Sequence, residues 1–155
     1  MSISCKKRDI GNCGPNAGDG YCIFHKPNKS TREAKAFYRE LRKKEDPKIE
    51  EIEGEESPRF VVQDGVNWEG YIFPPIPNDE SFSFRRAVFE KKTEFSNATF
   101  EGKADFWLST FRKSALFHNI EFKGEVDFGF SDFEDMAIFS ESEFRQKAGF
   151  ESCSF

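Results

Sequence analysis

Phenylalanine recurs at a regular spacing through the second half of the chain, and this spacing constrains the fold more than any other feature. Successive positions alternate between steps of five and six residues, so the repeating unit is eleven residues long. Fourteen of the twenty phenylalanines follow this rule: Phe84, Phe89, Phe95, Phe100, Phe106, Phe111, Phe117, Phe122, Phe128, Phe133, Phe139, Phe144, Phe150 and Phe155. From Phe89 onward, the residue two positions earlier is small or of modest size: Ala87, Thr93, Ala98, Ala104, Ser109, Ala115, Ile120, Val126, Ser131, Ala137, Ser142, Ala148 and Cys153.

This pattern predicts a coil of short strands. Residues two apart on a strand point to the same side, so each phenylalanine and its small partner are expected to face inward. Because a step of five or six residues is too short for a strand and its return, the chain must turn a corner at each step. Four corners give a coil of twenty-two residues, and successive coils are expected to stack about 4.8 Å apart.

The charged residues favour a period of twenty-two over one of eleven. Residues twenty-two apart would be vertical neighbours, where opposite charges are favourable. Two such columns alternate in sign: Glu90, Arg112 and Glu134, and Lys103, Glu125 and Lys147. A period of eleven would instead set Arg112 over Lys123. The same period predicts inward columns of stacked rings, such as Phe84, Phe106, Phe128 and Phe150, and Phe89, Phe111, Phe133 and Phe155.

Residues 83–155 are thus assigned to the coil, and residues 60–82 to a cap that covers its first layer. The pattern is expected to begin in the cap, because Trp68 lies five residues before Phe73 and Phe73 lies eleven before Phe84. Three prolines after Phe73 are expected to distort this first turn. The chain stops on a core position, which predicts either a longer rod or an end that pairs with a second copy.

Residues 1–29 hold three of the four cysteines in a loop-rich stretch that is too short to bury a core. Cys5, Cys13, Cys22 and His25 are spaced C-x7-C-x8-C-x2-H, which suits three thiolates and one imidazole around a tetrahedral Zn²⁺. Metal binding would then supply the folding energy of this head. The alternatives are unconnected thiols beside a surface histidine, or a disulfide between Cys5 and Cys13. A complete ligand shell leaves no open position, so a structural site is expected.

Residues 30–46 are predicted to form a basic amphipathic helix. Ser30 and Glu33 match a capping box, and Pro47 would end the helix. Apolar residues follow at positions that share one helix face: Ala34, Phe37, Tyr38 and Leu41. The basic residues either contact a nucleic acid backbone or form a solvated face whose apolar stripe packs on the head or the coil. The second interpretation is favoured, because no base-reading motif accompanies the charge.

Charge is divided unevenly along the chain. Residues 1–44 carry a net charge of +7, residues 45–80 carry −9 and residues 81–155 carry −3. Residues 47–59 are acidic and poor in bulky apolar groups, which is typical of a flexible linker. The N-terminus lacks the apolar run of a secretory signal, and no stretch approaches the roughly 18 apolar residues of a membrane span, so we expect a cytoplasmic protein with no membrane association.

These features resemble the pentapeptide-repeat family, in the variant that alternates five- and six-residue steps. The central phenylalanines and the small residues two positions earlier match the family pattern, and Ala104-Asp105-Phe106 reproduces its A-[DN]-[LF] core. The resemblance implies an all-β fold, a right-handed quadrilateral β-helix, here preceded by the head and one helix. The stretch Cys22-Ile23-Phe24-His25 also resembles a short Cys/His knuckle of some bacterial and archaeal members.

The resemblance says less about function. Some family members bind DNA gyrase by mimicking duplex DNA with an acidic rod, but the coil of this chain is near neutral, with Asp105 and Asp127 as its main acidic pair. DNA mimicry is therefore disfavoured. Catalysis is not expected, because there is no Gly-rich phosphate loop and no nucleophile beside a base. His118 follows Phe117 and is predicted to face solvent.

Apolar residues outside the inward pattern indicate a surface for a partner. Leu108 and Phe130 lie twenty-two residues apart beside Trp107, and Leu116 and Ile138 form a second pair on a neighbouring side. Exposed apolar patches often mark interaction sites, although corner side chains can also fold back over the coil edge. We expect a non-catalytic interaction or scaffold protein with an unidentified protein partner. A nucleic-acid-associated protein that uses the basic head is the alternative.

Overall fold

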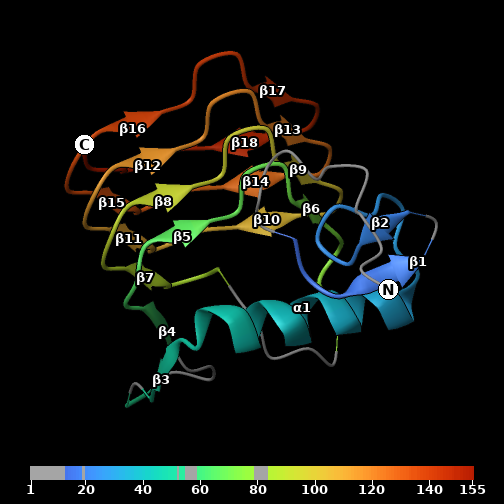
Figure 1. The fold of residues 1–155 in the computed structure, drawn as a ribbon. Helices are drawn as coiled ribbons and strands as arrows, with labels where there is room; N and C mark the ends of the chain where they lie inside the picture. The colour runs from blue at the N-terminus through green and yellow to red at the C-terminus, as the bar shows by residue number, and fades with distance from the viewer. Residues whose placement is uncertain (1–12, 19, 52, 55–58, 79–83) are drawn as a thin grey trace.

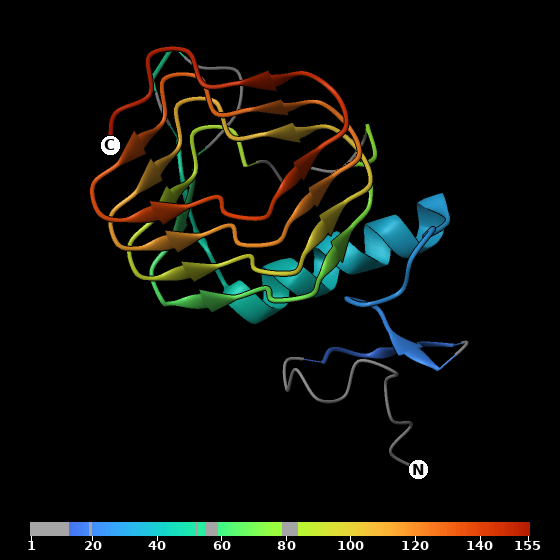
Figure 2. The ribbon, with the colours of Figure 1, turned by 90° about the horizontal axis from the view of Figure 1, so that it is seen from above.

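The chain forms a stack of short parallel strands that wind around a common core, with one helix at the start of the stack. The computed structural model describes residues 13–18, 20–51, 53–54, 59–78 and 84–155. Within these ranges, α1 (Thr31–Glu45) lies across one end of the stack, and the C-terminus lies at the other end (Figure 1). Seen along the stack, the coils lie over one another with the helix beneath them (Figure 2).

The strands of the coil fall into four sheets, each built from parallel neighbours. The β7 sheet contains β4 (Arg59–Val62), β7 (Val88–Phe89), β11 (Thr110–Phe111) and β15 (Asp132–Phe133). The β8 sheet contains β5 (Val66–Asn67), β8 (Thr93–Glu94), β12 (Ala115–Leu116) and β16 (Ala137–Ile138). The β9 sheet contains β6 (Ile72–Phe73), β9 (Thr99–Phe100), β13 (Glu121–Phe122) and β17 (Glu143–Phe144). The β10 sheet contains β10 (Ala104–Asp105), β14 (Val126–Asp127) and β18 (Ala148–Gly149).

The strand register confirms the predicted period of twenty-two residues. Thr110 pairs with Val88 on one side and with Asp132 on the other, and the other sheets keep the same spacing from β7 onward. One of the two charge columns that favoured this period also forms a contact, because Arg112 Nε lies 3.5 Å from Glu90 Oε2. The repetitive parallel β-structure expected from the phenylalanine spacing is therefore present.

The first coil departs from this period. Phe73 pairs with Phe100, so neighbours in the first two coils are twenty-seven residues apart. Phe73 therefore does not stand one regular repeat before Phe84, because five additional residues enter the coil between them, in the turn that the prolines were expected to distort. Trp68 and Phe73 still face inward, as expected, with exposed fractions of 1% for each side chain. These side chains thus still face the core despite the insertion, because their direction depends on the alternation of side chains within each strand and not on the length of the corner.

The phenylalanine rings stack in columns through the core, as the sequence predicted. Consecutive rings in the Phe89 column, which continues through Phe111 to Phe133, are 4.8 Å apart at both steps. Phe106 and Phe128 are also 4.8 Å apart, with an angle of 6° between their planes. Many rings of different columns meet edge to face, as Phe117 and Phe128 do at 5.3 Å. These are the two arrangements that the charge distribution of aromatic rings favours.

Polar residues at the small inward position satisfy their hydrogen bonds on the backbone. Ser109 Oγ donates to the carbonyl oxygen of Phe84, and Ser131 Oγ donates to that of Phe106, both at 2.7 Å. Cys153 Sγ makes the same contact with the carbonyl oxygen of Phe128 at 2.9 Å. A small polar group can therefore replace alanine in the core at little cost, because it is not left unpaired.

Each five-residue step between core phenylalanines contains a residue with a left-handed backbone, two positions after the first phenylalanine. This residue makes the turn tighter, which explains why the steps alternate between five and six residues. The turn after Phe95 is closed by the amide of Ala98, which donates to the carbonyl oxygen of Phe95 at 3.0 Å. Its third residue, Asn97, has φ 60°, as in a type II turn. The equivalent residues recur every eleven positions: Arg86, Asn97, Leu108, Asn119, Phe130, Glu141 and Ser152. The six-residue steps turn without such a residue.

Replacing Asn119 with alanine should destabilise the protein by about 1–2 kcal/mol. Asn119 has φ 53°, which alanine adopts poorly, and its Nδ2 donates to Asn97 Oδ1 at 2.8 Å. Asn119→Gly should cost less, because glycine tolerates positive φ. Urea denaturation measures the difference, with exposed Lys113→Ala as the control. Equal stabilities of the alanine and glycine variants would contradict the turn assignment.

The helix covers the open start of the stack. Ser30 and Glu33 form the predicted capping box, and the four predicted apolar residues are all buried: Ala34, Phe37, Tyr38 and Leu41. Phe37 meets Phe73 of the first coil at 5.3 Å between ring centroids, and Tyr38 donates a hydrogen bond to the carbonyl oxygen of Pro74 at 2.6 Å. The apolar stripe therefore packs on the coil, so α1 closes the end that residues 60–82 were expected to cover.

A short strand lies within the stretch that the sequence assigned to a linker. The strand β3 (Lys48–Glu50) pairs antiparallel with β4, and Glu50 forms an ion pair with Arg59. Because β4 is the first strand of its sheet, its outer edge offers unpaired backbone groups, and β3 occupies them. Acidic composition alone did not indicate this pairing.

Candidate functional site

The head is a small hairpin that brings distant cysteines together. The strands β1 (Asn16–Gly18) and β2 (Tyr21–Cys22) pair antiparallel, and the amide of Ile23 donates to the carbonyl oxygen of Pro15 at 2.7 Å. A turn follows at once, in which the amide of His25 donates to the carbonyl oxygen of Cys22 at 3.2 Å. This turn folds the imidazole back over the thiol three residues before it.

Cys13, Cys22 and His25 lie close enough to bind a metal ion. Their ligand atoms all lie within 4.8 Å of one another. His25 Nδ1 is 3.0 Å from Cys22 Sγ and 3.7 Å from Cys13 Sγ. His25 is fully buried and Cys22 is 3% exposed, whereas Cys13 lies at the surface. The sequence prediction brought these three residues together correctly, and Cys5, its fourth ligand, lies outside the described residues.

The geometry fits a tetrahedral ion with thiolate and imidazole ligands. With zinc-ligand distances of about 2.3 Å for sulfur and about 2.05 Å for nitrogen, a tetrahedral angle separates sulfur from nitrogen by about 3.6 Å. The distance from Cys13 Sγ to His25 Nδ1 agrees with this value, and that from Cys22 Sγ is somewhat shorter. Because Nδ1 faces both sulfurs, one ion placed between the three atoms would contact each of them.

The head is packed firmly against the helix and the first coil. Phe24 stacks on Tyr71 at 4.6 Å between ring centroids and meets Phe37 edge to face at 5.6 Å. Its carbonyl oxygen accepts a hydrogen bond from the amide of Ile72 at 2.8 Å. A Cβ atom on Gly14 would lie 2.4 Å from the Phe24 ring, so only glycine fits there. Phe24, which lies directly before the ligand His25 in the sequence, therefore anchors the site to the helix and the first coil.

A partly buried lysine lies beside the site. Lys29 Nζ donates to the carbonyl oxygen of Ile72 at 2.6 Å and lies 4.9 Å from the centre of the Phe37 ring. Burial lowers the pKa of Lys29 to about 8, although Glu101 and Cys22 act in the opposite direction. Sequence reasoning counted the basic residues of this region but did not identify this one.

The proposed interaction residues divide into two separate places. Leu108 and Phe130 occupy the same corner of successive coils and are 38% and 46% exposed, and the rings of Trp107 and Phe130 are 5.8 Å apart. Leu116 and Ile138 are paired neighbours in the β8 sheet and only partly exposed. The β7 sheet lies between the two groups along the chain, so they do not form one patch. The first group, Trp107, Leu108 and Phe130, is called the aromatic corner below.

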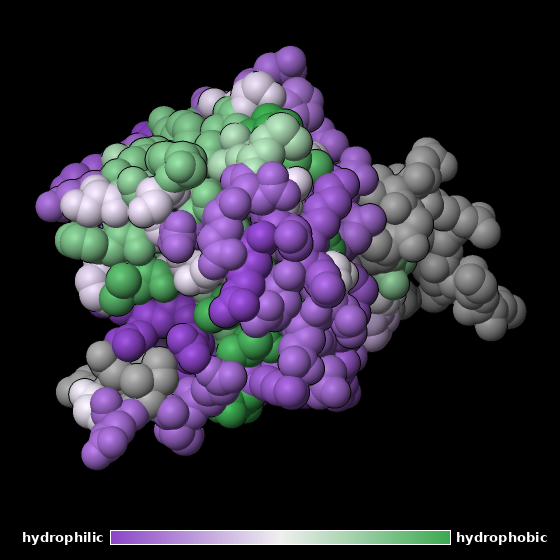
Figure 3. Space-filling view, turned by 90° about the vertical axis from the view of Figure 1, so that its left-hand side faces the viewer, coloured by the Kyte–Doolittle hydropathy of each residue, from purple (hydrophilic) through white to green (hydrophobic). Residues whose placement is uncertain are grey.

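The surface of the coil is mixed in character. Figure 3 shows apolar surface gathered over the upper coils of one face and hydrophilic surface over most of the rest of that face. Among the described residues, the large apolar side chains that are exposed include Met136 at 55% and Ile49 at 56%. No helix in the described ranges has both the length and the apolar character needed to cross a membrane.

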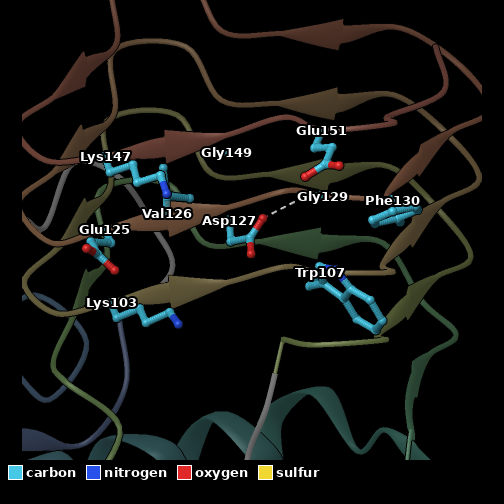
Figure 4. Close-up of a pocket in the computed structure, with 10 residues that line it drawn as sticks. All are labelled: Lys103, Trp107, Glu125, Val126, Asp127, Gly129, Phe130, Lys147, Gly149 and Glu151. Carbon is cyan, nitrogen blue, oxygen red and sulfur yellow. Dashed lines mark hydrogen bonds between the residues drawn. The ribbon is translucent and has the colours of Figure 1, made fainter.

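A surface groove adjoins the aromatic corner, and sequence reasoning did not identify it. It has a volume of about 210 Å³ and is lined by residues of the β10 sheet and the turns beside it (Figure 4). Figure 4 shows Lys103, Glu125 and Lys147 on one side, Trp107 and Phe130 on the other, and Asp127 between them. The spacing of twenty-two residues indicates that Lys103, Glu125 and Lys147 are neighbours in successive coils. It does not indicate the groove, because the groove depends on how the side chains pack.

Comparisons of this chain with protein family models, with curated proteins and with solved structures give no match. The repeat itself, the coil that it forms and the Cys/His cluster are therefore the basis for a functional assignment.

Proposed function

We propose that this protein is a non-catalytic interaction or scaffold protein of the pentapeptide-repeat type. The four sheets support a β-helix with four sides, and the five- and six-residue steps match those of the family that the sequence resembles. The proposed fold is accordingly a right-handed quadrilateral β-helix. A rigid rod with turns repeated at fixed intervals presents side chains in predictable columns, which suits recognition better than chemistry.

The head is proposed to hold a structural Zn²⁺, with Cys5 as the fourth ligand beside Cys13, Cys22 and His25. The support is the cluster of three ligand atoms within 4.8 Å and the burial of the imidazole. Two soft thiols and one imidazole suit zinc better than they suit magnesium or calcium, which prefer oxygen ligands. Four protein ligands leave no open coordination position, so the ion would stabilise the head and would not take part in catalysis.

One observation carries the proposed interaction role: two bulky apolar residues occupy turn positions that normally favour glycine or asparagine. Leu108 and Phe130 each have φ 56° and lie at the surface. The equivalent residues at the opposite corner include Asn97 and Asn119, which suit this backbone well. A large side chain with positive φ is strained, and the part of each side chain that is exposed to water contributes no burial to offset this strain. We infer that these side chains are retained for contact with a partner.

The double variant Leu108→Ser and Phe130→Ser should weaken partner binding at least about tenfold, because two central apolar contacts are removed. The measurement is quantitative cross-linking and affinity capture from native extract, together with sedimentation of the purified protein. Ile49→Ser is the matched control, since Ile49 is also an exposed apolar residue but lies on β3. Unchanged partners and unchanged self-association in the double variant would refute the interaction surface.

Nucleic acid binding through the basic helix has weaker support. Several of its basic side chains lie in ion pairs with acidic residues of the same helix, as Lys43 does with Glu40 at 3.1 Å and Lys44 with Glu45 at 3.1 Å. The apolar face of the helix is buried against the coil, which leaves only the outer face accessible. The aromatic corner is therefore preferred as the site of interaction.

A further inference from the structure

The groove beside the aromatic corner lies on the far side of an indole that already binds a guanidinium group. The Arg85 guanidinium carbon lies 4.0 Å from the centre of the Trp107 ring, and Arg85 Nη1 lies 3.3 Å from Asp105 Oδ2. The chain itself thus shows one arginine held by an aromatic face and a carboxylate. This arrangement combines a cation–π contact with a charged hydrogen bond, and arginine suits both.

The next coil repeats the carboxylate but not the arginine. Asp127 pairs with Asp105 in the β10 sheet, one coil further along. Arg85 and Trp107 belong to a column of residues twenty-two apart that continues with Gly129 and Glu151. Arg85 does not line the groove, whereas Gly129 and Glu151 do, so the groove opens on the side of the indole that faces away from Arg85.

Two glycines keep this space open. A Cβ atom on Gly129 would lie 3.2 Å from Trp107 Cδ1, and one on Gly149 would lie 3.0 Å from Asp127 Oδ1. Gly149 stands where the two preceding coils have Asp105 and Asp127, so a side chain is missing from the column at this level. The hollow therefore follows from the residues present and is bounded by an indole on one side and a carboxylate behind it.

The carboxylate at the back of the groove has capacity for a further hydrogen bond. Asp127 Oδ1 accepts from the amide of Gly129 at 2.8 Å, which fixes the orientation of the group. Among the described residues, Asp127 forms no ion pair, although Lys103 and Lys147 also line the groove. Glu151 adds a second carboxylate above the aromatic side, as Figure 4 shows.

We propose that this groove binds the side chain of an arginine presented by a partner polypeptide. The guanidinium would lie against Trp107 beside the edge of Phe130 and pair with Asp127, as Arg85 does with Trp107 and Asp105 in the preceding coil. The lysines at the other end repel a second positive charge, so a single arginine is favoured over a basic tract. This inference rests on the proposed interaction role and names the chemistry of the partner.

The test is a titration of the whole 155-residue chain with three short peptides. Binding is monitored through the indole N–H resonances in nuclear magnetic resonance spectra. The peptides are acetyl-Gly-Arg-Gly-amide and the versions with lysine or citrulline in place of arginine. The chain has two tryptophans, and Trp68 is only 1% exposed, so its resonance is an internal control. The Trp107 resonance should shift with the arginine peptide until the site is saturated. The affinity for the citrulline peptide should be at least about tenfold lower.

Two variants separate the charge of the groove from its shape. Asp127→Asn should weaken arginine peptide binding at least about tenfold, yet the amide oxygen of asparagine can still accept from Gly129. Gly129→Ala should weaken binding by filling the space beside Trp107. Asp132→Asn is the matched control, because Asp132 is an exposed carboxylate on the β7 sheet. Thermal melting of each variant establishes that the coil is intact.

The outcomes distinguish this inference from the wider interaction role. Equal binding of the arginine and citrulline peptides, or no effect of Asp127→Asn, would overturn the arginine site. Equal binding of the lysine peptide would overturn the preference for a guanidinium. If the arginine site fails while the Leu108 and Phe130 double variant still loses its partner, the interaction role stands with a different ligand. If that double variant also keeps its partners, both proposals fail.

Discussion

Replacing Cys22 with serine should abolish metal binding by the head and detach the head from the coil. Cys22 Sγ is the buried thiol nearest to His25 Nδ1, at 3.0 Å, and serine is a poor ligand for a soft metal site. Because metal binding supplies the folding energy of such small heads, the loss should destabilise the head by on the order of 4 kcal/mol. Metal analysis should fall from about one equivalent of zinc to a negligible level.

Hydrogen exchange reports whether the head has detached. The amide of Ile72 donates to the carbonyl oxygen of Phe24, so its exchange should become much faster in Cys22→Ser, while amides of the later coils such as Lys123 keep their protection. Cys153→Ser is the matched control, since Cys153 lies in the last coil and contacts the carbonyl oxygen of Phe128. Less than half an equivalent of metal in the unmodified protein, with Cys13 and Cys22 freely alkylated, would refute the site.

Replacing Phe117 with alanine should destabilise the coil by about 3–5 kcal/mol. Phe117 is fully buried and stacks on Phe95 at 4.9 Å and on Phe139 at 4.7 Å. Its edge contacts with Phe128 and Phe111 join its column to two others. The cavity would therefore remove contacts on several sides at once, and a rigid backbone ladder cannot collapse to fill it. Urea denaturation followed by circular dichroism measures the loss.

Phe155→Ala is the matched control for this prediction. Phe155 is 77% exposed and stacks on a single neighbour, Phe133, at 5.1 Å. Its replacement should cost less than about 1 kcal/mol, because little apolar area returns to water. Comparable losses in the two variants would show that the stacked columns are not the main source of stability.

Much of the coil could be predicted from residue spacing, because one physical rule repeats at every step. Alternation along a strand sends residues two apart to the same side, so each phenylalanine and the small residue before it had to share the core. The charge column of Glu90 and Arg112 then indicated the period, since only residues in adjacent coils can pair in this way. The helix was equally readable, because its cap and its apolar stripe are local features.

The first coil and the strand β3 were less predictable, because they depend on contacts between distant segments. The prolines after Phe73 indicated that the first turn is irregular, but they did not indicate its length, and the pairing of Phe73 with Phe100 depends on how the two strands meet. The segment around Ile49 is acidic and poor in bulky apolar residues, yet it completes the edge of β4. In both places, backbone groups left open by the coil decide the structure.

Local periods and short spacings were enough to predict the repeat, the inward rings, the helix and three residues of the Cys/His cluster, namely Cys13, Cys22 and His25. The tertiary structure decided where the head lies, because Phe24 must find Tyr71 and Ile72, which are far along the chain. It also decided that Trp107 has one face covered by Arg85 while a groove opens on its other side. Such a hollow depends on which side chains are absent from neighbouring coils, and spacing alone does not reveal its depth.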